Sequence, residues 1–374
     1  MRVLIDARVI QDHFPGIGRY TFNLIEALAP QLPGELLVLV DENAANTRYH
    51  LPQLARYPNV QLIPTDIPIF HWLSQTALPR LIARFRPDVV HFVYNVRPLR
   101  GGPPSVLTLY DVIPRRFPHY FSRLTRWKIE GIQRAALRAS DAFVSISHST
   151  AQDFAELYGV AREKIVVTPL APDPVFHPRP IAEQVAFRQR LGLPEGYFLY
   201  LGSNKPHKNL PRLIRAWAQI PKSKIRNLKL VLAGHWDVRY PQAKELAAEL
   251  GLQDSVRFLG PVAGADLPLL YASAQAFIFP SLYEGFGLPV LEAMASHVPV
   301  ACSDAPGLSE VAGQAALTFD PADVDEMTRV IQQLLTDEPL REMLREKGIA
   351  RAADFSWAET ARLTLEAYRK VASS

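Results

Sequence analysis

Residues 276–295 read AFIFPSLYEGFGLPVLEAMA: a short apolar run, a loop with two glycines, and a helical pattern. The apolar run ends at Phe279, and Pro289 stands in the first turn of a helix that begins near Leu288, where proline is favoured. This order predicts a buried strand followed by a helix, with Glu284 at the carboxyl end of the strand. Backbone amides at the start of such a helix bind anions and hydroxyls directly. The stretch therefore indicates an α/β fold with a ligand site at this strand end.

The same alternation of apolar runs and helical patterns extends through the rest of the chain. We expect strands at 2–6, 36–40, 60–63, 88–92, 106–110, 142–146, 197–201, 229–233, 256–259 and 276–279. We expect helices at 18–28, 122–139, 151–158, 211–219, 241–250 and 265–273. Apolar strands bracketed by helices indicate parallel sheets covered on both faces. A proline-rich passage, residues 169–180, interrupts the pattern and predicts two doubly wound, Rossmann-like domains with a cleft between them.

Composition limits the class of protein. The chain has 374 residues, of which 48% are apolar and 21% charged, a balance that excludes disorder and collagen-like structure. The single cysteine, Cys302, excludes an intramolecular disulfide and a cluster of thiolate metal ligands. No run approaches the ~18 apolar residues of a membrane span, and the first apolar run stops at Asp6, too early for a signal peptide. We therefore expect a cytoplasmic protein.

Positive charge is concentrated in one segment. Residues 97–138 contain nine arginines and lysines against Asp111 and Glu130, although the net charge of the whole chain is only +4. Such a local excess favours a polyanion or an anionic surface as partner, and a merely solvated helix face is the alternative.

Two segments of the second half have the residues that a nucleotide sugar requires. In the first, the amides of Gly285, Phe286, Gly287 and Leu288 are expected to face a ligand, and Glu292 lies about one turn into the following helix. Its two carboxylate oxygens suit the diol of a ribose. The alternative is a glycine-rich connection whose glutamates are only solvated.

The second segment, residues 202–209, reads GSNKPHKN between a predicted strand and a predicted helix. Gly202 and Ser203 allow close approach of the backbone to a diphosphate, and Lys205 and Lys208 neutralise its oxygens. An ordinary surface turn is the alternative. Base recognition is expected in the loops at 234–237 and 260–262.

The Glu-x7-Glu pattern after a strand and Pro-Ser, followed by PVLEAMA, closely resembles the retaining nucleotide-sugar glycosyltransferases of family 4, which have the GT-B fold. The resemblance covers nearly the whole chain. It implies that Glu284 contacts the hydroxyls of the donor sugar and that Glu292 holds the ribose. In the basic loop Lys208 matches the family pattern, whereas His207 stands where the family often has arginine.

The resemblance also implies the division of the chain. We expect an acceptor-binding domain at 1–178, joined by a C-terminal helix at about 356–374 that packs back on it, and a donor-binding domain at 179–355. A terminal helix that stays on the second domain is the alternative. Ser356 is a plausible cap for this helix, and serines near His148 are expected to cap the helix at 151–158.

In the first domain the resemblance points to two further segments. Gly16, Ile17, Gly18 and Arg19 are implied to close over the donor phosphate and to line the acceptor site, with a tight strand-to-helix turn as the alternative. Tyr110 and Asp111 stand where the family commonly has His-Asp and are our further catalytic candidates. Tyr110 can donate a hydrogen bond but carries no charge near neutral pH. Asp111 is alternatively only a helix cap.

The function implied is transfer of a hexose, with retention, from a nucleoside-diphosphate sugar to a saccharide or a lipid-linked saccharide. Residues 110–114 and 117–121 look closest to bacterial mannosyltransferases of surface polysaccharide and lipopolysaccharide synthesis, so GDP-mannose is favoured over a UDP-sugar. No Asp-x-Asp motif is present, and the lysines and helix amides can neutralise the leaving group, so we expect no metal and no other cofactor. The alternatives are a nucleotide-sugar epimerase and a non-catalytic, two-domain sugar-binding protein.

Cations alternate with aromatic residues between residues 114 and 128. Arg115, Arg116, Arg123 and Arg126 are our candidates for contact with the acceptor or with the anionic inner face of a membrane. No recognised nucleic-acid module is present, so we do not expect a nucleic-acid partner.

Overall fold

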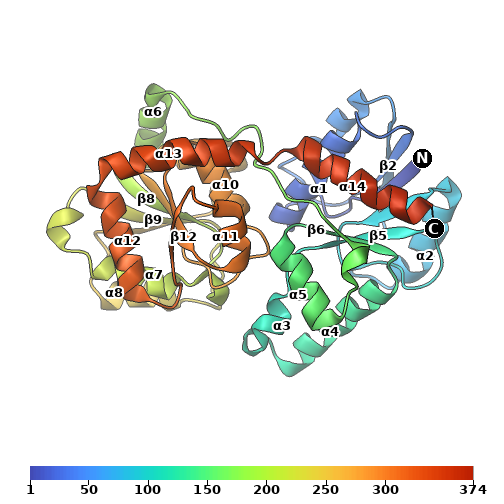
Figure 1. Ribbon diagram of the computed structural model, residues 1–374, viewed down its shortest axis with the longest axis horizontal. Coiled ribbons are helices and arrows are strands. Elements are labelled where there is room, and N and C mark those ends of the chain that lie inside the picture. Colours follow the sequence, from blue (N-terminus) through green and yellow to red (C-terminus); the bar gives the residue numbers. More distant parts are fainter. Residues whose placement is uncertain (374) are drawn as a thin grey trace. The chain divides into compact units, whose positions relative to one another are not determined.

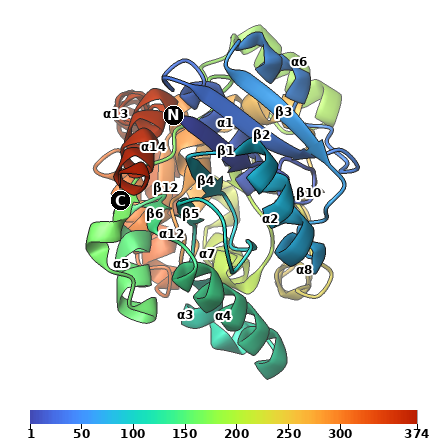
Figure 2. The same ribbon diagram turned by 90° about the vertical axis from the view of Figure 1, so that its right-hand side faces the viewer.

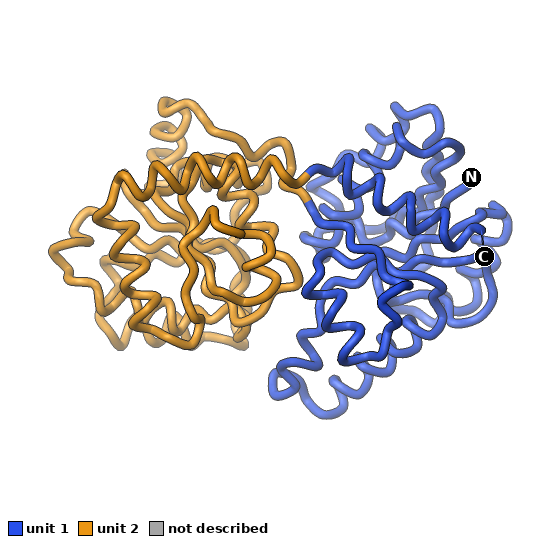
Figure 3. The backbone as a smooth tube through the Cα atoms, in the orientation of Figure 1, with its two compact units in different colours: residues 1–170, 356–374 blue, residues 171–355 orange. Residues whose placement is uncertain are grey.

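The computed structural model describes residues 1–373, apart from the side chain of Pro15. The chain forms two compact units (Figure 3): unit 1 comprises residues 1–170 and 356–374, and unit 2 comprises residues 171–355. The terminal segment thus belongs to unit 1, and the division after residue 170 lies earlier in the proline-rich passage than the expected one after residue 178.

Unit 1 contains a seven-stranded, fully parallel sheet in the order β3-β2-β1-β4-β5-β6-β7. Its strands are β1 (Arg2–Asp6), β2 (Glu35–Asp41), β3 (Val60–Thr65), β4 (Val89–Phe92), β5 (Ser105–Leu109), β6 (Ala142–Ser145) and β7 (Ile165–Val167). Its helices are α1 (Pro15–Leu28), α2 (Leu73–Phe85), α3 (Ile113–Arg116), α4 (Arg123–Arg138), α5 (His148–Tyr158) and α14 (Trp357–Ala372). Right-handed crossovers put α1 on one face and α2, α4 and α5 on the other, and α14 packs beside α1 (Figures 1 and 2).

Unit 2 contains a six-stranded parallel sheet in the order β10-β9-β8-β11-β12-β13. Its strands are β8 (Gly196–Leu201), β9 (Leu228–Ala233), β10 (Val256–Gly260), β11 (Ala276–Phe279), β12 (Val300–Ser303) and β13 (Leu317–Phe319). Its helices are α6 (Ile181–Leu191), α7 (Leu210–Ala218), α8 (Gln242–Glu249), α9 (Leu267–Ala272), α10 (Leu288–Ala295), α11 (Pro306–Ala312), α12 (Val324–Thr336) and α13 (Glu338–Ala353). Within this unit α12 packs on α7, and α13 packs on α10.

Every strand expected from the sequence is present, with ends that agree within two residues. Three expected helices begin differently, one of which is the helix expected at 151–158, which begins at His148. The helix expected from residue 18 begins at Pro15, because proline suits the first helical position. The helix expected at 265–273 is a 3₁₀ turn, Gly264–Asp266, followed by α9. Both expected serine caps are confirmed, since Ser147 accepts the Thr150 N–H at 2.9 Å and Ser356 accepts the Glu359 N–H at 3.2 Å.

A buried polar chain anchors α14 to the sheet of unit 1. The two ring nitrogens of His91, on β4, lie 2.7 Å from the Tyr368 hydroxyl of α14 and 2.8 Å from the Thr108 hydroxyl of β5. His91 and Tyr368 are completely buried. The terminal helix is therefore held by hydrogen bonds in addition to its apolar face, which explains its place in unit 1.

No helix of the described residues has the length and the apolar composition that crossing a bilayer requires.

The buried His91 predicts a dependence of stability on pH. Burial lowers the pKa of His91 from 6.5 to about 3. Between these values the unfolded chain binds a proton that the folded chain does not, so stability falls as the pH is lowered. The substitution His91→Gln removes the group that binds this proton in the unfolded chain. The slope of the free energy of unfolding against pH should therefore decrease by about 1.4 kcal/mol per pH unit. Urea unfolding from about pH 4.5 to about pH 7 measures the difference, and identical slopes for the two proteins would refute it.

Candidate active site

Two loops of unit 2 meet where the strand order of its sheet reverses. From β8 the chain proceeds to β9 on one side, whereas β11 lies on the other side and leads to β12. Ligands of doubly wound sheets bind at such a point, beyond the carboxyl ends of the strands. Lys208 follows β8 and Glu284 follows β11, and the Lys208 Nζ lies 2.6 Å from the Glu284 Oε1. Their side chains are only 16% and 15% exposed. The two residues that sequence analysis assigned to the donor thus form one half-buried ion pair.

Asn209 holds the basic loop in place. Its backbone has φ +62°, a left-handed conformation that asparagine tolerates better than most residues. Its side-chain amide donates to the carbonyls of Pro280 at 3.0 Å and Pro321 at 2.8 Å. Because Pro280 begins the loop that contains Glu284, this amide fixes Lys208 relative to Glu284. Sequence analysis missed the role of Asn209, although an asparagine immediately before a helix was the available signal.

The other basic residues of this loop contribute unequally to its charge. His207 is buried, and desolvation together with Lys208 and Lys205 lowers its pKa to about 3. The imidazole is therefore neutral at physiological pH and does not replace the charge of the arginine that the family often has. Lys205 is exposed, whereas the Lys208 ammonium lies 5.3 Å from the centre of the Phe279 ring. Lys208 is the fixed cation of the loop.

Close approach of the backbone explains two glycines at neighbouring strand ends. A Cβ on Gly234, where φ is +120°, would lie 2.2 Å from the carbonyl oxygen of Gly202. Asn204 ties the same loops together, since its amide donates to the carbonyls of Asp237 and Tyr240 at 2.8 and 2.7 Å. The loop expected to recognise the base is thus attached to the loop expected to bind the diphosphate, next to Ser203. The sequence contained no clear signal for this role of Asn204.

The segment between β11 and α10 packs closely against Gly307 and Phe355. A Cβ on Gly307 would lie 2.3 Å from the carbonyl oxygen of Glu284, and Gly287 has φ +130° immediately before α10. The Phe286 side chain is buried and meets Phe355 edge-on at 5.9 Å. Among residues 285–288, Phe286 can therefore offer a ligand only its backbone. Gly285 lies in the same segment, and Leu288 is the first residue of α10.

Glu292 is a buried carboxylate on α10. The residue is 3% exposed, and the hydroxyl of Tyr271 on α9 donates to its Oε2 at 2.9 Å. Sequence analysis predicted Glu292 as a ligand of the ribose but did not identify Tyr271, which lies 21 positions earlier in the chain.

Residues 16–19 lie in unit 1, in the first turn of α1 after β1. A Cβ on Gly18 would lie 3.2 Å from the Val9 carbonyl oxygen, whereas Gly16 has open space around it. The ring of Phe14, which precedes this turn, lies 5.4 Å from that of Tyr94, which follows β4. Since β1 and β4 are neighbours where the strand order of this sheet reverses, residues 16–19 occupy the position in unit 1 that Lys208 occupies in unit 2.

Tyr110 and Asp111 follow β5 and precede α3 in unit 1. The Tyr110 hydroxyl is buried with no hydrogen-bond partner among the described residues, and its ring meets Tyr20 edge-on at 5.6 Å. Burial and the neighbouring Tyr20 raise its pKa well above 10, so the phenol stays neutral. The Asp111 Oδ1 accepts the Ile113 N–H at 3.0 Å and caps α3. The catalytic role expected of this pair stays a prediction, and the structure shows a phenol hydroxyl that is buried and a carboxylate that accepts a backbone N–H.

Of the four arginines in the basic segment that were expected at a membrane or acceptor, three are already ion-paired. Arg116 pairs with the buried Asp153, and Arg115 and Arg126 lie 3.1 and 4.0 Å from Glu130. The pairs of Arg115 and Arg116 join α3 to α4 and to α5, whereas the pair of Arg126 lies within α4. Arg123 is exposed at the start of α4.

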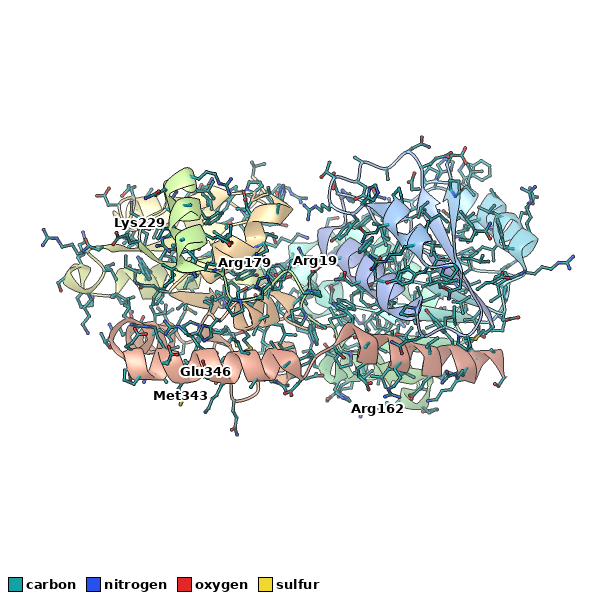
Figure 4. All side chains as sticks on the ribbon, turned by 90° about the horizontal axis from the view of Figure 1, so that it is seen from above. Arg19, Arg162, Arg179, Lys229, Met343 and Glu346 are labelled. Atoms are coloured by element: carbon teal, nitrogen blue, oxygen red, sulfur yellow. The ribbon has the colours of Figure 1, made fainter. Side chains whose placement is uncertain are left out.

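One group of potential metal ligands lies among the described residues of unit 2. His297, Glu342 and Glu346 place one ligand atom each within 4.8 Å of one another. His297 precedes β12, and Glu346 lies on α13 (Figure 4). The group therefore lies at the amino end of the sheet, opposite the edge with Lys208 and Glu284.

Two protein-family models match the chain in the order of its two units. The model described as glycosyltransferase family 4 matches residues 15–175, and the model described as glycosyl transferases group 1 matches residues 183–351. O-antigen chain mannosyltransferase B of Escherichia coli is 30% identical over 99% of this chain and 100% of its own length. O-antigen chain mannosyltransferase RfbU of Salmonella typhimurium is 28% identical over 71% of this chain and 69% of its own.

Solved structures share the fold. Sucrose-phosphate synthase of Thermosynechococcus elongatus superimposes with a TM-score of 0.77 at 22% identity, covering 100% of this chain and 99% of that one. WaaG, a glycosyltransferase involved in lipopolysaccharide biosynthesis, superimposes with a TM-score of 0.75 at 18% identity over 100% of both chains. The expected GT-B fold is confirmed. Because both family models and a relative matched over its full length agree, this chain belongs to the family 4 glycosyltransferases and is a glycosyltransferase.

Proposed function

We propose that this glycosyltransferase transfers mannose from GDP-mannose, with retention and without a metal ion, to a saccharide or lipid-linked saccharide of a bacterial surface polysaccharide. The choice of mannose is supported by the two O-antigen mannosyltransferases among its relatives. The observation that carries the reaction is the ion pair of Lys208 and Glu284 at the reversal of the strand order in unit 2.

The ion pair explains how donor binding prepares the site. A diphosphate carries more negative charge than one carboxylate and has several acceptor oxygens, so it competes with Glu284 for Lys208. Once the diphosphate takes the lysine, both oxygens of Glu284 are free to accept hydrogen bonds from the hydroxyls of the sugar. In this proposal Lys208 binds the diphosphate, Glu284 orients the sugar, and Glu292 binds the ribose.

The chemistry follows from the charge that develops on the leaving group. As the bond between the anomeric carbon and the phosphate oxygen breaks, negative charge accumulates on the diphosphate. Lys208, Lys205 and the amides at the start of α10 stabilise that charge. A departing phosphate oxygen accepts the proton of the acceptor hydroxyl, and the new bond forms on the face that the diphosphate leaves. Retention then requires no covalent intermediate on Glu284.

Neither alternative function has comparable support. An epimerase needs an acid and a base around the sugar, but the phenol of Tyr110 is held neutral by burial and Asp111 caps a helix. A non-catalytic sugar-binding protein would not need Lys208 to exchange Glu284 for a diphosphate.

The pair of Lys208 and Glu284 predicts opposite effects on binding and turnover. Glu284→Gln removes the competitor of the diphosphate, so GDP binds as tightly as to the wild type or more tightly, while turnover falls about 100-fold because the sugar is no longer oriented. Lys208→Met weakens GDP binding and lowers turnover together. Isothermal titration with GDP and a transfer assay measure the two effects.

Lys224→Met, which removes a lysine before β9 at the amino end of the sheet, is the control and should leave both quantities unchanged. Full turnover by Glu284→Gln, or equal loss of GDP affinity in the two site variants, would contradict these assignments.

The choice of donor predicts which nucleotide stabilises the fold. A nucleotide present at about 100 times its dissociation constant adds about 2.7 kcal/mol to the free energy of unfolding. We expect GDP and GDP-mannose to raise the melting temperature more than the corresponding UDP, dTDP and ADP compounds. If UDP-sugars gave the largest rise in melting temperature, the donor would be a UDP-sugar and not GDP-mannose. The assignment as a glycosyltransferase would still hold.

We further propose that the enzyme binds an anionic membrane surface through α4 of unit 1 and encounters its acceptor there. Leu124 and Trp127, three positions apart on one face of this helix, are 62% and 74% exposed. Another side of α4 carries Ile132, which is 46% exposed and lines a pocket of about 310 Å³ with Phe70, itself 64% exposed.

Cations border the apolar face of α4. Arg123 and Lys128 are exposed beside Trp127, and Arg123 and Trp127 help to line a pocket of about 540 Å³. A helix with exposed aromatic and aliphatic residues next to cations matches an interface in which acyl chains meet anionic headgroups. The occupant that fits this combination is an anionic lipid surface.

The α4 surface predicts salt-sensitive binding to vesicles. Arg123→Ser with Lys128→Ser should weaken binding to phosphatidylglycerol vesicles about 30-fold, since each cation contributes about 1 kcal/mol. Leu124→Ser with Trp127→Ser should weaken it at both low and high salt, because the apolar contribution is not screened. The ion-paired Arg115, Arg116 and Arg126 are left unchanged, and Val238→Ser on unit 2 is the control. Equal co-sedimentation of all variants would refute this docking surface.

A further inference from the structure

The loop after β8 contains a run of backbone N–H groups that no carbonyl or side chain accepts. Within the described part of the chain, the backbone N–H groups of Ser203, Asn204 and Lys205 have no hydrogen-bond partner. The N–H before them, that of Gly202, still donates to the Ala233 carbonyl at 3.0 Å. Ser203 is half-buried and Lys205 is exposed, so the loop is open to solvent. Successive unpaired backbone N–H groups are the donors of anion-binding loops.

A buried tyrosine holds this loop from the side of the sheet. The hydroxyl of Tyr200, on β8, donates to the Ser203 carbonyl at 2.6 Å. Tyr200 is 1% exposed, and its ring stacks on that of Phe279 of β11 at 6.0 Å. A Cβ on Gly202 would lie 2.6 Å from the Tyr200 hydroxyl. The glycine therefore leaves the space through which the hydroxyl reaches the loop.

The contact with the Ser203 carbonyl sets the direction of the next N–H. The peptide bonds of the described residues are trans, and in a trans peptide the C=O and the following N–H point in opposite directions. Because the Ser203 carbonyl points at a buried hydroxyl, the Asn204 N–H points away from that hydroxyl. The side-chain amide of Asn204 is fixed separately, through the carbonyls of Asp237 and Tyr240.

Tyr200 lies beside the ion pair of the donor site. Its ring stacks on Phe279, and the Lys208 ammonium lies 5.3 Å from the centre of that same Phe279 ring. Burial, and after it the charge of Glu284, raise the pKa of Tyr200 well above 10. The phenol therefore remains protonated at physiological pH and can keep donating to the loop.

We propose that Tyr200 is a positioning residue for the diphosphate: its hydroxyl holds the Ser203 carbonyl so that the Asn204 N–H donates to an oxygen of the diphosphate that Lys208 binds. The inference rests on the proposed nucleoside-diphosphate donor. An N–H that is fixed in advance needs no reorganisation when negative charge develops on the leaving group. Without the hydroxyl, the peptide between residues 203 and 204 can rotate, and ordering it on binding reduces the affinity.

The test separates the phosphates of the ligand from its nucleoside. In Tyr200→Phe the stacking on Phe279 remains, and only the hydroxyl is lost. Isothermal titration should show that GDP and inorganic pyrophosphate each bind roughly tenfold more weakly, the effect of one hydrogen bond to a charged group. Guanosine should bind equally to variant and wild type, because it has no phosphate. Pyrophosphate makes the result independent of which base the enzyme prefers.

The chain offers a matched control in Tyr197. This tyrosine lies on the same strand, is also completely buried, and donates to the carbonyl of Leu270 at 2.6 Å. Tyr197→Phe thus removes an equivalent hydrogen bond to a backbone carbonyl, but outside the loop at 202–205. The two variants should lose similar amounts of melting temperature, whereas only Tyr200→Phe should lose affinity for GDP and pyrophosphate.

Each outcome decides between distinct interpretations. Equal weakening of guanosine and GDP by Tyr200→Phe would show a general disturbance of unit 2 and overturn the proposal. Unchanged binding of pyrophosphate, or the same loss of affinity in Tyr197→Phe, would overturn it as well. Binding of GDP but not of pyrophosphate by the wild type would show that this loop does not hold the diphosphate. Failure of the wild type to bind any nucleoside diphosphate would overturn the proposed function itself, and this inference with it.

Discussion

The hydrogen bonds of Asn209 are the constraint on which the arrangement of the donor loops depends. Its amide joins the loop after β8 to the carbonyl of Pro280, the first residue of the loop after β11. These loops leave neighbouring strands toward opposite sides of the sheet, so without a tie they would diverge. With the tie, Lys208 and Glu284 meet as an ion pair. The position of the cation, and hence of any diphosphate it binds, follows from this junction.

The ion pair illustrates how a site can be ordered before its ligand arrives. A half-buried lysine or glutamate alone would bear an uncompensated desolvation cost. Pairing them reduces that cost and holds both side chains near the positions that a donor requires. The cost of organising the site is thus met in folding, and in the proposed reaction donor binding exchanges one partner of Lys208 for another. Glu292 and Tyr271 form a second such contact, in which a buried hydroxyl donates to a buried carboxylate.

Unit 1 is built on the same sheet plan but has a different surface. Its glycines open α1 at the reversal of the strand order, and its buried chain from Tyr368 through His91 to Thr108 holds the terminal helix on the sheet. Its basic segment divides into two parts. The ion pairs of Arg115 and Arg116 join α3 to α4 and to α5, and Arg126 pairs within α4, whereas the exposed face of α4 carries apolar residues. A high local charge therefore does not by itself make a cationic surface.

The amino-acid sequence alone determined ten of the strands, the two-unit α/β plan and the family, because apolar periodicity and the Glu-x7-Glu pattern are local properties of the chain. The short strands β7, β12 and β13 were not predicted. The strand at 276–279 and the helix from Leu288 agree with the structure residue by residue. Tertiary structure decided which side chains meet: Lys208 and Glu284 are 76 positions apart. It also showed that His207 is neutral, that the Tyr110 hydroxyl is buried and that Tyr271 supports Glu292. These properties depend on burial and on contacts between distant segments, and no local pattern of residues encodes either.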